Sequence, residues 1–171
     1  MNWFVMAESN ISSLDISRKL KKIIRDSPFF INLFKKYNVP IDVMDDNLTF
    51  KIRKMRGVHA QSNSKEISLN SKLFENGDFF ENHIHFVIHE LVHWLTRQRE
   101  NKYYFSDHEE IEAFIYGMAY QLFNGKNKIE IEKTFYPIIK EHFKSEIKAK
   151  IFFEYLFEEA IRKIDYFQNG E

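Results

Sequence analysis

The segment His89-Glu90-Leu91-Val92-His93 decides how the rest of this sequence is interpreted, because it places an H-E-x-x-H pattern within helically spaced apolar residues. Residues four apart lie one above the other on one face of an α-helix, so His89 and His93 can both point at one metal ion. Glu90 lies beside them, within reach of a water molecule on that ion. Helix-borne zinc hydrolases use this arrangement, with two imidazole ligands and a carboxylate as general base.

The composition limits the classes of protein and of site. The chain has 171 residues, 44% of them hydrophobic, which is enough for one domain with a sizeable core. Its 25 basic and 25 acidic residues balance, so no overall field favours nucleic acid, and we do not expect nucleic acid as a partner. Cysteine is absent, so a metal ion would be held by His, Asp or Glu.

Two stretches bear on targeting. Residues 1–9 have neither a basic start nor a sustained apolar run, so we expect no signal peptide there. Residues 84–95 form the most apolar stretch, but His85, His89, Glu90 and His93 interrupt it, and it is too short to cross a bilayer. We therefore expect a soluble, cytoplasmic protein without a membrane partner. The sequence does not determine its oligomeric state.

Hydrophobic periodicity predicts an α+β fold that is mostly helical, with a small antiparallel sheet before the motif helix. No linker or repeat divides the chain, so we expect a single domain over residues 1–171. Its expected parts are N-terminal helices in 1–47, the small sheet in 48–70, the H-E-x-x-H helix in 78–99, a following helix in 106–124, and C-terminal helices in 127–168 with a break near Pro137.

Local signals support the sheet and the motif helix. Apolar and polar residues alternate from Leu48 to Lys54, and two further extended pieces follow at 58–61 and 66–69, close enough for an antiparallel meander. Asp78 and Glu81 have the spacing of a capping box that opens the motif helix. The buried stripe of that helix is expected at Ile84, Val87, Ile88, Leu91 and Leu95.

A catalytic zinc site needs a third protein ligand. The extended H-E-x-x-H-x-x-G-x-x-H pattern is absent, because Thr96 and Arg99 stand where its Gly and third His would be. The helix expected at 106–124 offers carboxylates instead. Glu112 lies in the middle of that helix among apolar neighbours, where a carboxylate is costly to bury without a partner, so we expect Glu112 to be the ligand.

Two other carboxylates on this helix have an explanation as helix caps, since Ser106-x-x-Glu109 and Asp107-x-x-Glu110 are both possible capping boxes. Glu109 is the reserve, either as the metal ligand or as a hydrogen-bond acceptor for a ligand histidine. Glu110 points about 100° away from Glu109 around the helix.

The sequence predicts the roles of other polar residues near the motif less specifically. His85 lies four residues before His89, but three histidines over two turns span about 12 Å, too far to share one ion. It is expected at the surface or beside a ligand. His108 and Tyr116 are candidates for contact with a substrate oxyanion, although His108 sits at a helix start and Tyr116 also suits core packing.

The pattern H-E-L-V-H-W followed by an E-I-E-A helix resembles the gluzincin-type zincin metallopeptidases, especially small phage and bacterial peptidases and, more distantly, the ImmA/IrrE family. That resemblance covers about residues 56–123. It implies a zincin-like domain with His89 and His93 as zinc ligands, Glu90 as general base and Glu112 as third ligand. The fuller gluzincin pattern has an Asp four residues after the ligand Glu, where this chain has Tyr116.

The resemblance implies a zinc metallopeptidase, a hydrolase that cleaves a peptide or protein substrate through a zinc-activated water with Glu90 as general base. The segment 57–70 resembles the short zincin sheet whose edge strand holds substrate in extended form. The alternative is a catalytically inactive binding or regulatory protein of the same fold, similar to an anti-repressor. A basic run at Lys51, Arg53, Lys54 and Arg56 could be a modest binding patch, but such runs are more often a solvated strand face. The plainest alternative is that the motif residues are ordinary polar residues on a helix.

Overall fold

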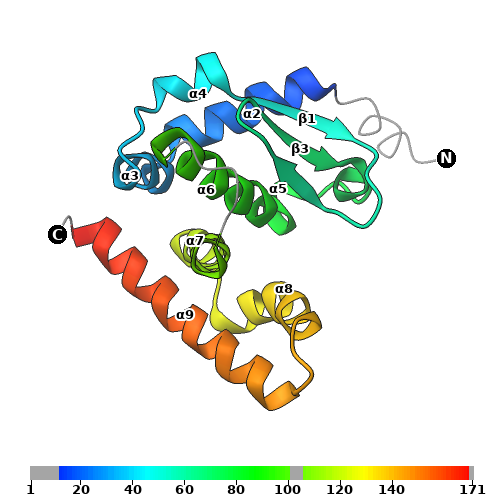
Figure 1. Cartoon of the computed structure of the whole chain (residues 1–171), viewed down its shortest axis with the longest axis vertical. Coiled ribbons are helices and arrows are strands. Elements are labelled where there is room, and N and C mark those ends of the chain that lie inside the picture. Colours follow the sequence, from blue (N-terminus) through cyan, green and yellow to red (C-terminus); the bar gives the residue numbers. More distant parts are fainter. Residues whose placement is uncertain (1–11, 101–105, 170–171) are drawn as a thin grey trace. The chain divides into compact units, whose positions relative to one another are not determined.

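The computed structural model describes residues 12–100 and 106–169 (Figure 1). The chain forms two compact units, Met1–Tyr104 and Phe105–Glu171. The structure is mostly helical with one small sheet, which confirms the α+β class. The expectation that both units belong to one domain stays a prediction.

The first unit carries the sheet and the motif helix. Its described elements, in chain order, are α2 (Ser13–Asp26), α3 (Pro28–Lys36), α4 (Asp42–Asn47), β1 (Thr49–Arg53), β2 (Ala60–Ser62), β3 (Glu66–Asn70), the 3-10 helix η1 (Ser71–Phe74), α5 (Phe79–Asn82) and α6 (Ile84–Glu100). The sequence predicted helices in the N-terminal part, and it predicted all three strands to within a few residues. It did not predict α4 or η1, which are short and have no extended apolar period.

The sheet is mixed, so the predicted antiparallel meander was wrong. The strand order is β1-β3-β2, with β1 parallel to β3 and β2 antiparallel to β3. β3 takes the centre because four consecutive residues, Ile67 to Asn70, are buried, whereas burial alternates along β1. Burial on both faces is the mark of a central strand. β2 is therefore an edge strand, and it packs against α6.

Side chains hold β1 on both of its long sides. On its outer edge, the backbone N–H groups of Phe50 and Ile52 donate to the hydroxyls of Ser17 and Ser13 on α2, at 3.3 and 3.1 Å. These bonds satisfy strand donors that would otherwise be exposed at the sheet edge. On the inner side, Glu66 of β3 forms ion pairs with two basic residues of β1, which are Lys51 at 2.8 Å and Arg53 at 2.7 Å.

α6 buries the apolar stripe that the sequence predicted, since Ile84, Val87, Ile88, Leu91 and Leu95 are each no more than 3% exposed. Burial of this stripe is the main reason that the helix forms where it does, because tertiary packing stabilises helices more than intrinsic propensity does.

Hydrogen bonds to the β2–β3 hairpin fix the far end of α6. The indole nitrogen of Trp94 donates to the carbonyl of Ser64 at 3.1 Å, and Arg97 donates to the hydroxyl of Ser62 at 2.9 Å. Trp94 itself is completely buried. The motif helix is thus held in a defined position against the edge strand.

The motif helix begins at Ile84 rather than at Asp78, so the predicted continuous helix over 78–99 was wrong at its start. Residues 79–82 form the separate one-turn helix α5, which ends at His83. Phe79 is buried and stacks on Phe74 of η1 with ring centroids 4.2 Å apart, which holds α5 against η1. The Asp78 side chain makes no helix cap; it accepts a hydrogen bond from the Asn82 amide at 2.8 Å instead.

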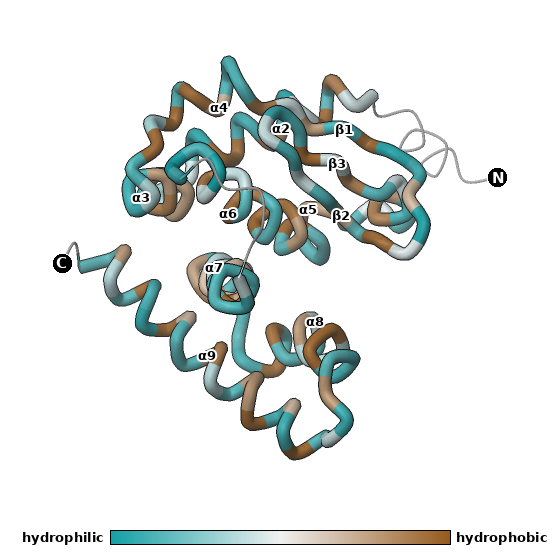
Figure 2. The backbone as a smooth tube through the Cα atoms, viewed as in Figure 1, coloured by the Kyte–Doolittle hydropathy of each residue, from teal (hydrophilic) through white to brown (hydrophobic). Residues whose placement is uncertain are grey.

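The second unit contains only helices among its described residues, which are α7 (Asp107–Phe123), α8 (Lys128–Glu141) and α9 (Glu146–Asn169). Apolar and hydrophilic residues alternate around α9, as expected for a helix with one packed face (Figure 2). No helix in the described ranges is both long and apolar enough to span a membrane.

The predicted break near Pro137 was wrong, because α8 continues through this residue. Ile131, Phe135 and Ile139 are buried along one face of α8, and this packing outweighs the loss of one backbone donor at the proline. The chain breaks at 142–145 instead. There, Ser145 accepts the first backbone hydrogen bonds of α9 from Lys148 and Ala149.

Candidate metal centre

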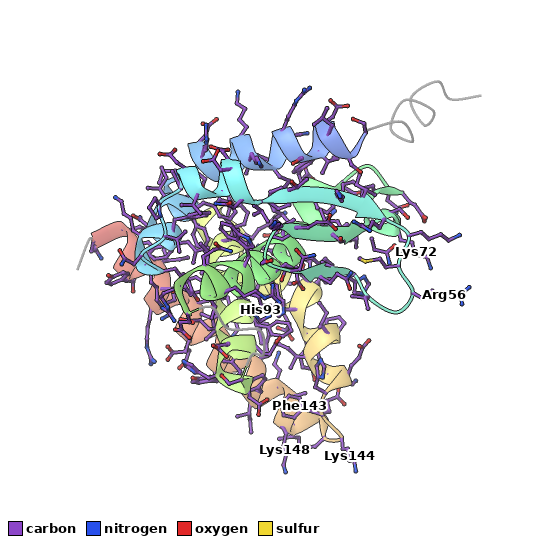
Figure 3. All side chains as sticks on the ribbon, turned by 45° about the horizontal axis from the view of Figure 1, so that its top comes forward. Arg56, Lys72, His93, Phe143, Lys144 and Lys148 are labelled. Carbon is purple, nitrogen blue, oxygen red and sulfur yellow. The ribbon has the colours of Figure 1, made fainter. Side chains whose placement is uncertain are left out.

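The two motif histidines converge. His89 and His93 lie one turn apart on α6, and their Nε2 atoms are 3.1 Å from each other, with ring centroids 4.7 Å apart (Figure 3 labels His93). Two nitrogen ligands about 2.0–2.1 Å from a tetrahedral ion are about 3.3 Å apart. The observed separation is therefore close to the spacing of a shared ion, and this donor pair suits zinc and similar transition metals.

Glu90 extends from the same turn of α6 and is half-buried, as is His89, whereas His93 is only 4% exposed. A partly exposed carboxylate next to converging imidazoles can accept a proton from a water molecule and still exchange it with solvent. The hydrogen bonds of Trp94 and Arg97 described above keep this part of α6 from fraying. The arrangement thus places two nitrogen donors and one potential base on a rigid helix.

His85 is only 5% exposed, so the expected surface position was wrong, while the alternative of a place beside a ligand stays a prediction. Its ring lies against Phe86, with centroids 4.2 Å apart. Burial, together with positive charge on the neighbouring histidines 83, 89 and 59, lowers the pKa of His85 to about 3. A neutral imidazole here adds no positive charge beside the histidine pair at neutral pH.

In the second unit, the structure settles which of the two possible capping boxes forms at the start of α7. Ser106 is the N-cap residue, and the Glu109 carboxylate accepts hydrogen bonds from the Ser106 backbone N–H at 2.5 Å and from its hydroxyl at 2.9 Å. Asp107 is the first residue of the helix, so the Asp107–Glu110 box is not formed. Glu110 is therefore not a capping residue, and the argument that excluded it as a metal ligand no longer applies.

The α7 carboxylates differ in their surroundings. Glu109 is buried with the cap, and Glu110 and Glu112 are half-buried on the first two turns. Glu112 as third ligand, and Glu109 as ligand or hydrogen-bond acceptor, stay predictions. The sequence analysis did not choose Glu110 as a candidate ligand. The signal that could have identified it is the N-cap residue of α7: when Ser106 is the N-cap, Glu109 completes the capping box and Glu110 does not.

The two residues considered for oxyanion contact occupy different environments on α7. Tyr116 is buried, and its ring stacks on Phe167 of α9 with centroids 6.0 Å apart, while the ammonium of Lys163 lies 5.7 Å from the ring centre. Its core packing is thus observed. His108 is exposed in the first turn. A substrate contact by either residue stays a prediction.

Comparisons with protein-family models, with curated proteins and with solved structures found no match for this chain. The functional reasoning therefore depends on the geometry of the residues themselves.

Proposed function

We propose that this protein is a metal-dependent peptide hydrolase of zincin type, in which His89, His93 and Glu110 hold a divalent metal ion, most simply zinc. Two imidazoles and one carboxylate are a donor set found in catalytic zinc sites, which keep one further position for water or substrate. The observation that carries the proposal is the 3.1 Å separation of the two histidine Nε2 atoms on α6. When bound, such an ion supplies a Lewis acid that activates water and polarises a carbonyl group.

Glu90 is the residue that moves protons in this proposal. Its place beside His89 in the sequence puts its carboxylate next to the histidine pair, where it can take a proton from the attacking water. The same carboxyl group can then give that proton to the nitrogen of the departing amine. Peptide hydrolysis by this route needs no covalent intermediate with the protein.

Glu112 is the alternative third ligand. It is favoured by the resemblance of the E-I-E-A segment to gluzincins, whereas Glu110 is favoured because Ser106 and Glu109 form the capping box and Glu110 has no part in it. Both residues come from α7, so either choice leaves the chemistry unchanged. A catalytically inactive protein that uses the same residues to bind a partner is the second candidate function, and Tyr116 in place of the gluzincin Asp is the feature that favours it.

Replacing Glu90 by Gln tests the catalytic role separately from metal binding. We expect Glu90→Gln to keep its metal content and to lose about 100- to 10,000-fold in the rate of peptide cleavage, because general-base catalysis is worth that much. The assay follows internally quenched fluorescent peptide libraries with added Zn²⁺. The control is Glu158→Gln, the same change at an exposed position of α9, which should cleave at the wild-type rate.

Two outcomes would contradict the proposal. Cleavage by Glu90→Gln at the wild-type rate would remove the base assignment. A wild-type protein that binds one equivalent of metal and cleaves no member of the libraries would favour the binding protein instead.

A further inference from the structure

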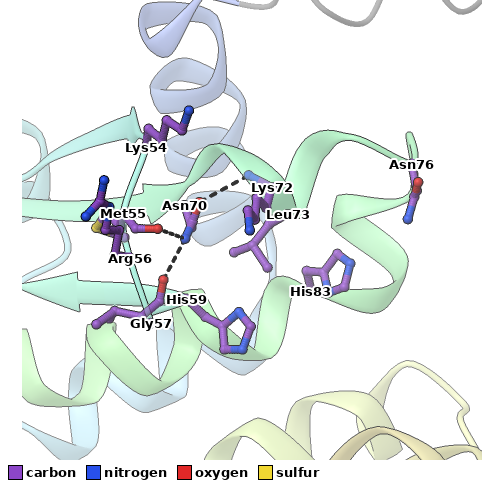
Figure 4. A pocket seen from close by; sticks show the side chains of 11 residues that line it. Lys54, Met55, Arg56, Gly57, His59, Asn70, Lys72, Leu73, Asn76 and His83 are labelled. Atoms are coloured by element: carbon purple, nitrogen blue, oxygen red, sulfur yellow. Dashed lines mark hydrogen bonds between the residues drawn. The ribbon is translucent and has the colours of Figure 1, made fainter.

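A basic pocket opens in the first unit, at the end of the sheet where β1 and β3 finish (Figure 4). Its volume is about 960 Å³. The walls come from the β1–β2 connection, the end of β3, η1 and His83, just before α6. All of these segments belong to the same unit as the two motif histidines.

The charge of the pocket has one sign. Lys54, Arg56 and Lys72 line it together with His59 and His83, and no acidic residue is among its lining residues. Within the described ranges, none of the three lysine and arginine side chains forms an ion pair. An anion entering the pocket would therefore find cations that are not already neutralised.

The neighbouring basic residues of β1 behave differently. Lys51 and Arg53 both pair with Glu66, as described above, so the basic run of the sequence is not one continuous patch of unpaired cations. Only its second half, Lys54 and Arg56, reaches the pocket, where Lys72 joins from η1. All four residues of the run are exposed, as the interpretation of a solvated face expects, and Lys54 and Arg56 also line the pocket.

The pocket wall is fixed in place by Asn70. This residue is 4% exposed, and its amide nitrogen donates to the carbonyls of Met55 at 2.8 Å and Val58 at 2.7 Å. Its amide oxygen accepts from the backbone N–H of Lys72 at 3.2 Å. One buried side chain therefore ties together the two segments that carry the cations, as Figure 4 shows. A pre-formed site loses less entropy on binding than a flexible one.

The pocket borders the motif helix. His59, on its wall, stacks on Phe86 of α6 with ring centroids 4.7 Å apart. Phe86 lies one helical turn before Glu90 and faces the same side of α6. β2 begins directly after His59, so the pocket also lies at the start of the edge strand. A peptide extended along this part of α6 could place one side chain in the pocket.

We propose that this pocket binds an anionic side chain of a peptide, with a carboxylate or phosphate group held by Lys54, Arg56 and Lys72. The inference rests on the proposed function, and it narrows the substrate class to peptides with an acidic or phosphorylated residue beside the cleaved bond. A peptide is favoured over nucleic acid for two reasons. The unpaired cations form a local cluster rather than a stripe along the surface, and the whole chain has no net charge.

Binding to labelled peptides tests this inference without turnover. The protein is full-length Glu90→Gln, and the probes are one fluorescent peptide with four consecutive Glu, its counterpart with Gln, its counterpart with phosphoserine, and a single-stranded oligonucleotide. We expect the Glu or the phosphoserine peptide to bind at least about tenfold more tightly than the Gln peptide, with an affinity that falls as salt is added. The two anionic probes distinguish the carboxylate from the phosphate.

Charge reversal localises the effect. Lys54→Glu with Lys72→Glu, added to that protein, should weaken binding of the anionic peptides about tenfold or more and leave the Gln peptide unchanged. The matched control is Lys22→Glu with Lys65→Glu, the same net change at two exposed lysines of the same unit. Lys65 lies in the β2–β3 turn, at the opposite end of the sheet from the pocket. The control should bind as the parent does.

Three results would overturn the inference: equal binding of the anionic and Gln peptides, equal weakening by the control, or preferential binding of the oligonucleotide. Cleavage by the wild-type protein separates these failures from failure of the proposed function. Cleavage without preference for acidic peptides, and a KM unchanged by the Lys54/Lys72 reversal, would refute the pocket while the hydrolase stands. Selective binding of acidic peptides that are never cleaved would refute the hydrolase while the pocket stands.

Discussion

The two ends of the region from Asp78 to His93 differ in how functional side chains are brought together: by helical spacing at one end, and by separate chain segments at the other. Near the end of this region, His89, Glu90 and His93 are arranged by the helix alone, and their spacing in the sequence is enough to bring the two Nε2 atoms within 3.1 Å. At its start, Asp78 makes no helix cap, the helix breaks at His83, and the neighbouring pocket is assembled from separate segments.

This contrast shows which kind of chemistry can be recognised from local spacing. The periodicity of a helix fixes residues i and i+4 on one face whatever the rest of the chain does. No such spacing rule predicts the basic pocket. The segments that carry Lys54 and Lys72 are brought together by the hydrogen bonds of the buried Asn70 side chain and by the order of the strands in the sheet. Local spacing likewise does not identify the proposed third metal ligand, because its candidates in the sequence lie outside the H-E-x-x-H segment.

The largest effect should come from removing that third ligand. We expect Glu110→Ala to weaken Zn²⁺ binding by at least about 100-fold, because loss of residues that merely support a ligand already costs 10- to 100-fold. Glu112→Ala is the matched comparison on the same helix. The measurement is competition for Zn²⁺ against a chromogenic chelator. If Glu112→Ala loses the metal and Glu110→Ala keeps it, the ligand predicted from the sequence is the correct one.

A second effect should appear at the start of α6, in the acid stability of the protein. The pKa of His85 lies at about 3 in the folded chain because of burial, below the ordinary value of 6.5. The unfolded chain therefore binds a proton between these values that the folded chain does not bind. Stability is lost as the pH falls from about 6.5 towards 3, by about 1.4 kcal/mol per pH unit.

Urea unfolding of wild type and His85→Gln over this pH range measures that contribution. The variant should show a shallower loss of unfolding free energy, and His142→Gln, at an exposed position after α8, should follow the wild type. All three proteins keep His89 and His93, so any contribution of this pair is common to them and cancels. Parallel curves for His85→Gln and wild type would show that the buried imidazole does not resist protonation.

The elements that the sequence predicted well are those with a long apolar period. The helix around His93 has such a period, and its buried face was placed correctly. The sheet was predicted as three strands but with the wrong neighbours, because the choice of the central strand depends on which faces the helices cover. The break expected at Pro137 did not occur, since burial of one face of α8 outweighs a single lost hydrogen bond.

The candidate site divides in the same way. The proposed ligand pair and base follow from five consecutive residues, whereas the sequence left open whether Glu109 or Glu110 completes the capping box of α7. Two capping boxes were possible from the sequence, and only the hydrogen bonds of Ser106 with Glu109 show which one forms. The residues of the basic pocket are separated by up to 29 positions along the chain, from Lys54 to His83, so no local pattern connects them.

The metal content of the protein tests the central claim most directly. After incubation with Zn²⁺ and gel filtration, elemental analysis of the wild-type protein should find about one equivalent of zinc per chain. The variant His89→Ala with His93→Ala should retain none, and His142→Ala should match the wild type. A wild-type protein without zinc after this treatment, or a double variant that keeps a full equivalent, would contradict the claim that the two α6 histidines hold a metal ion.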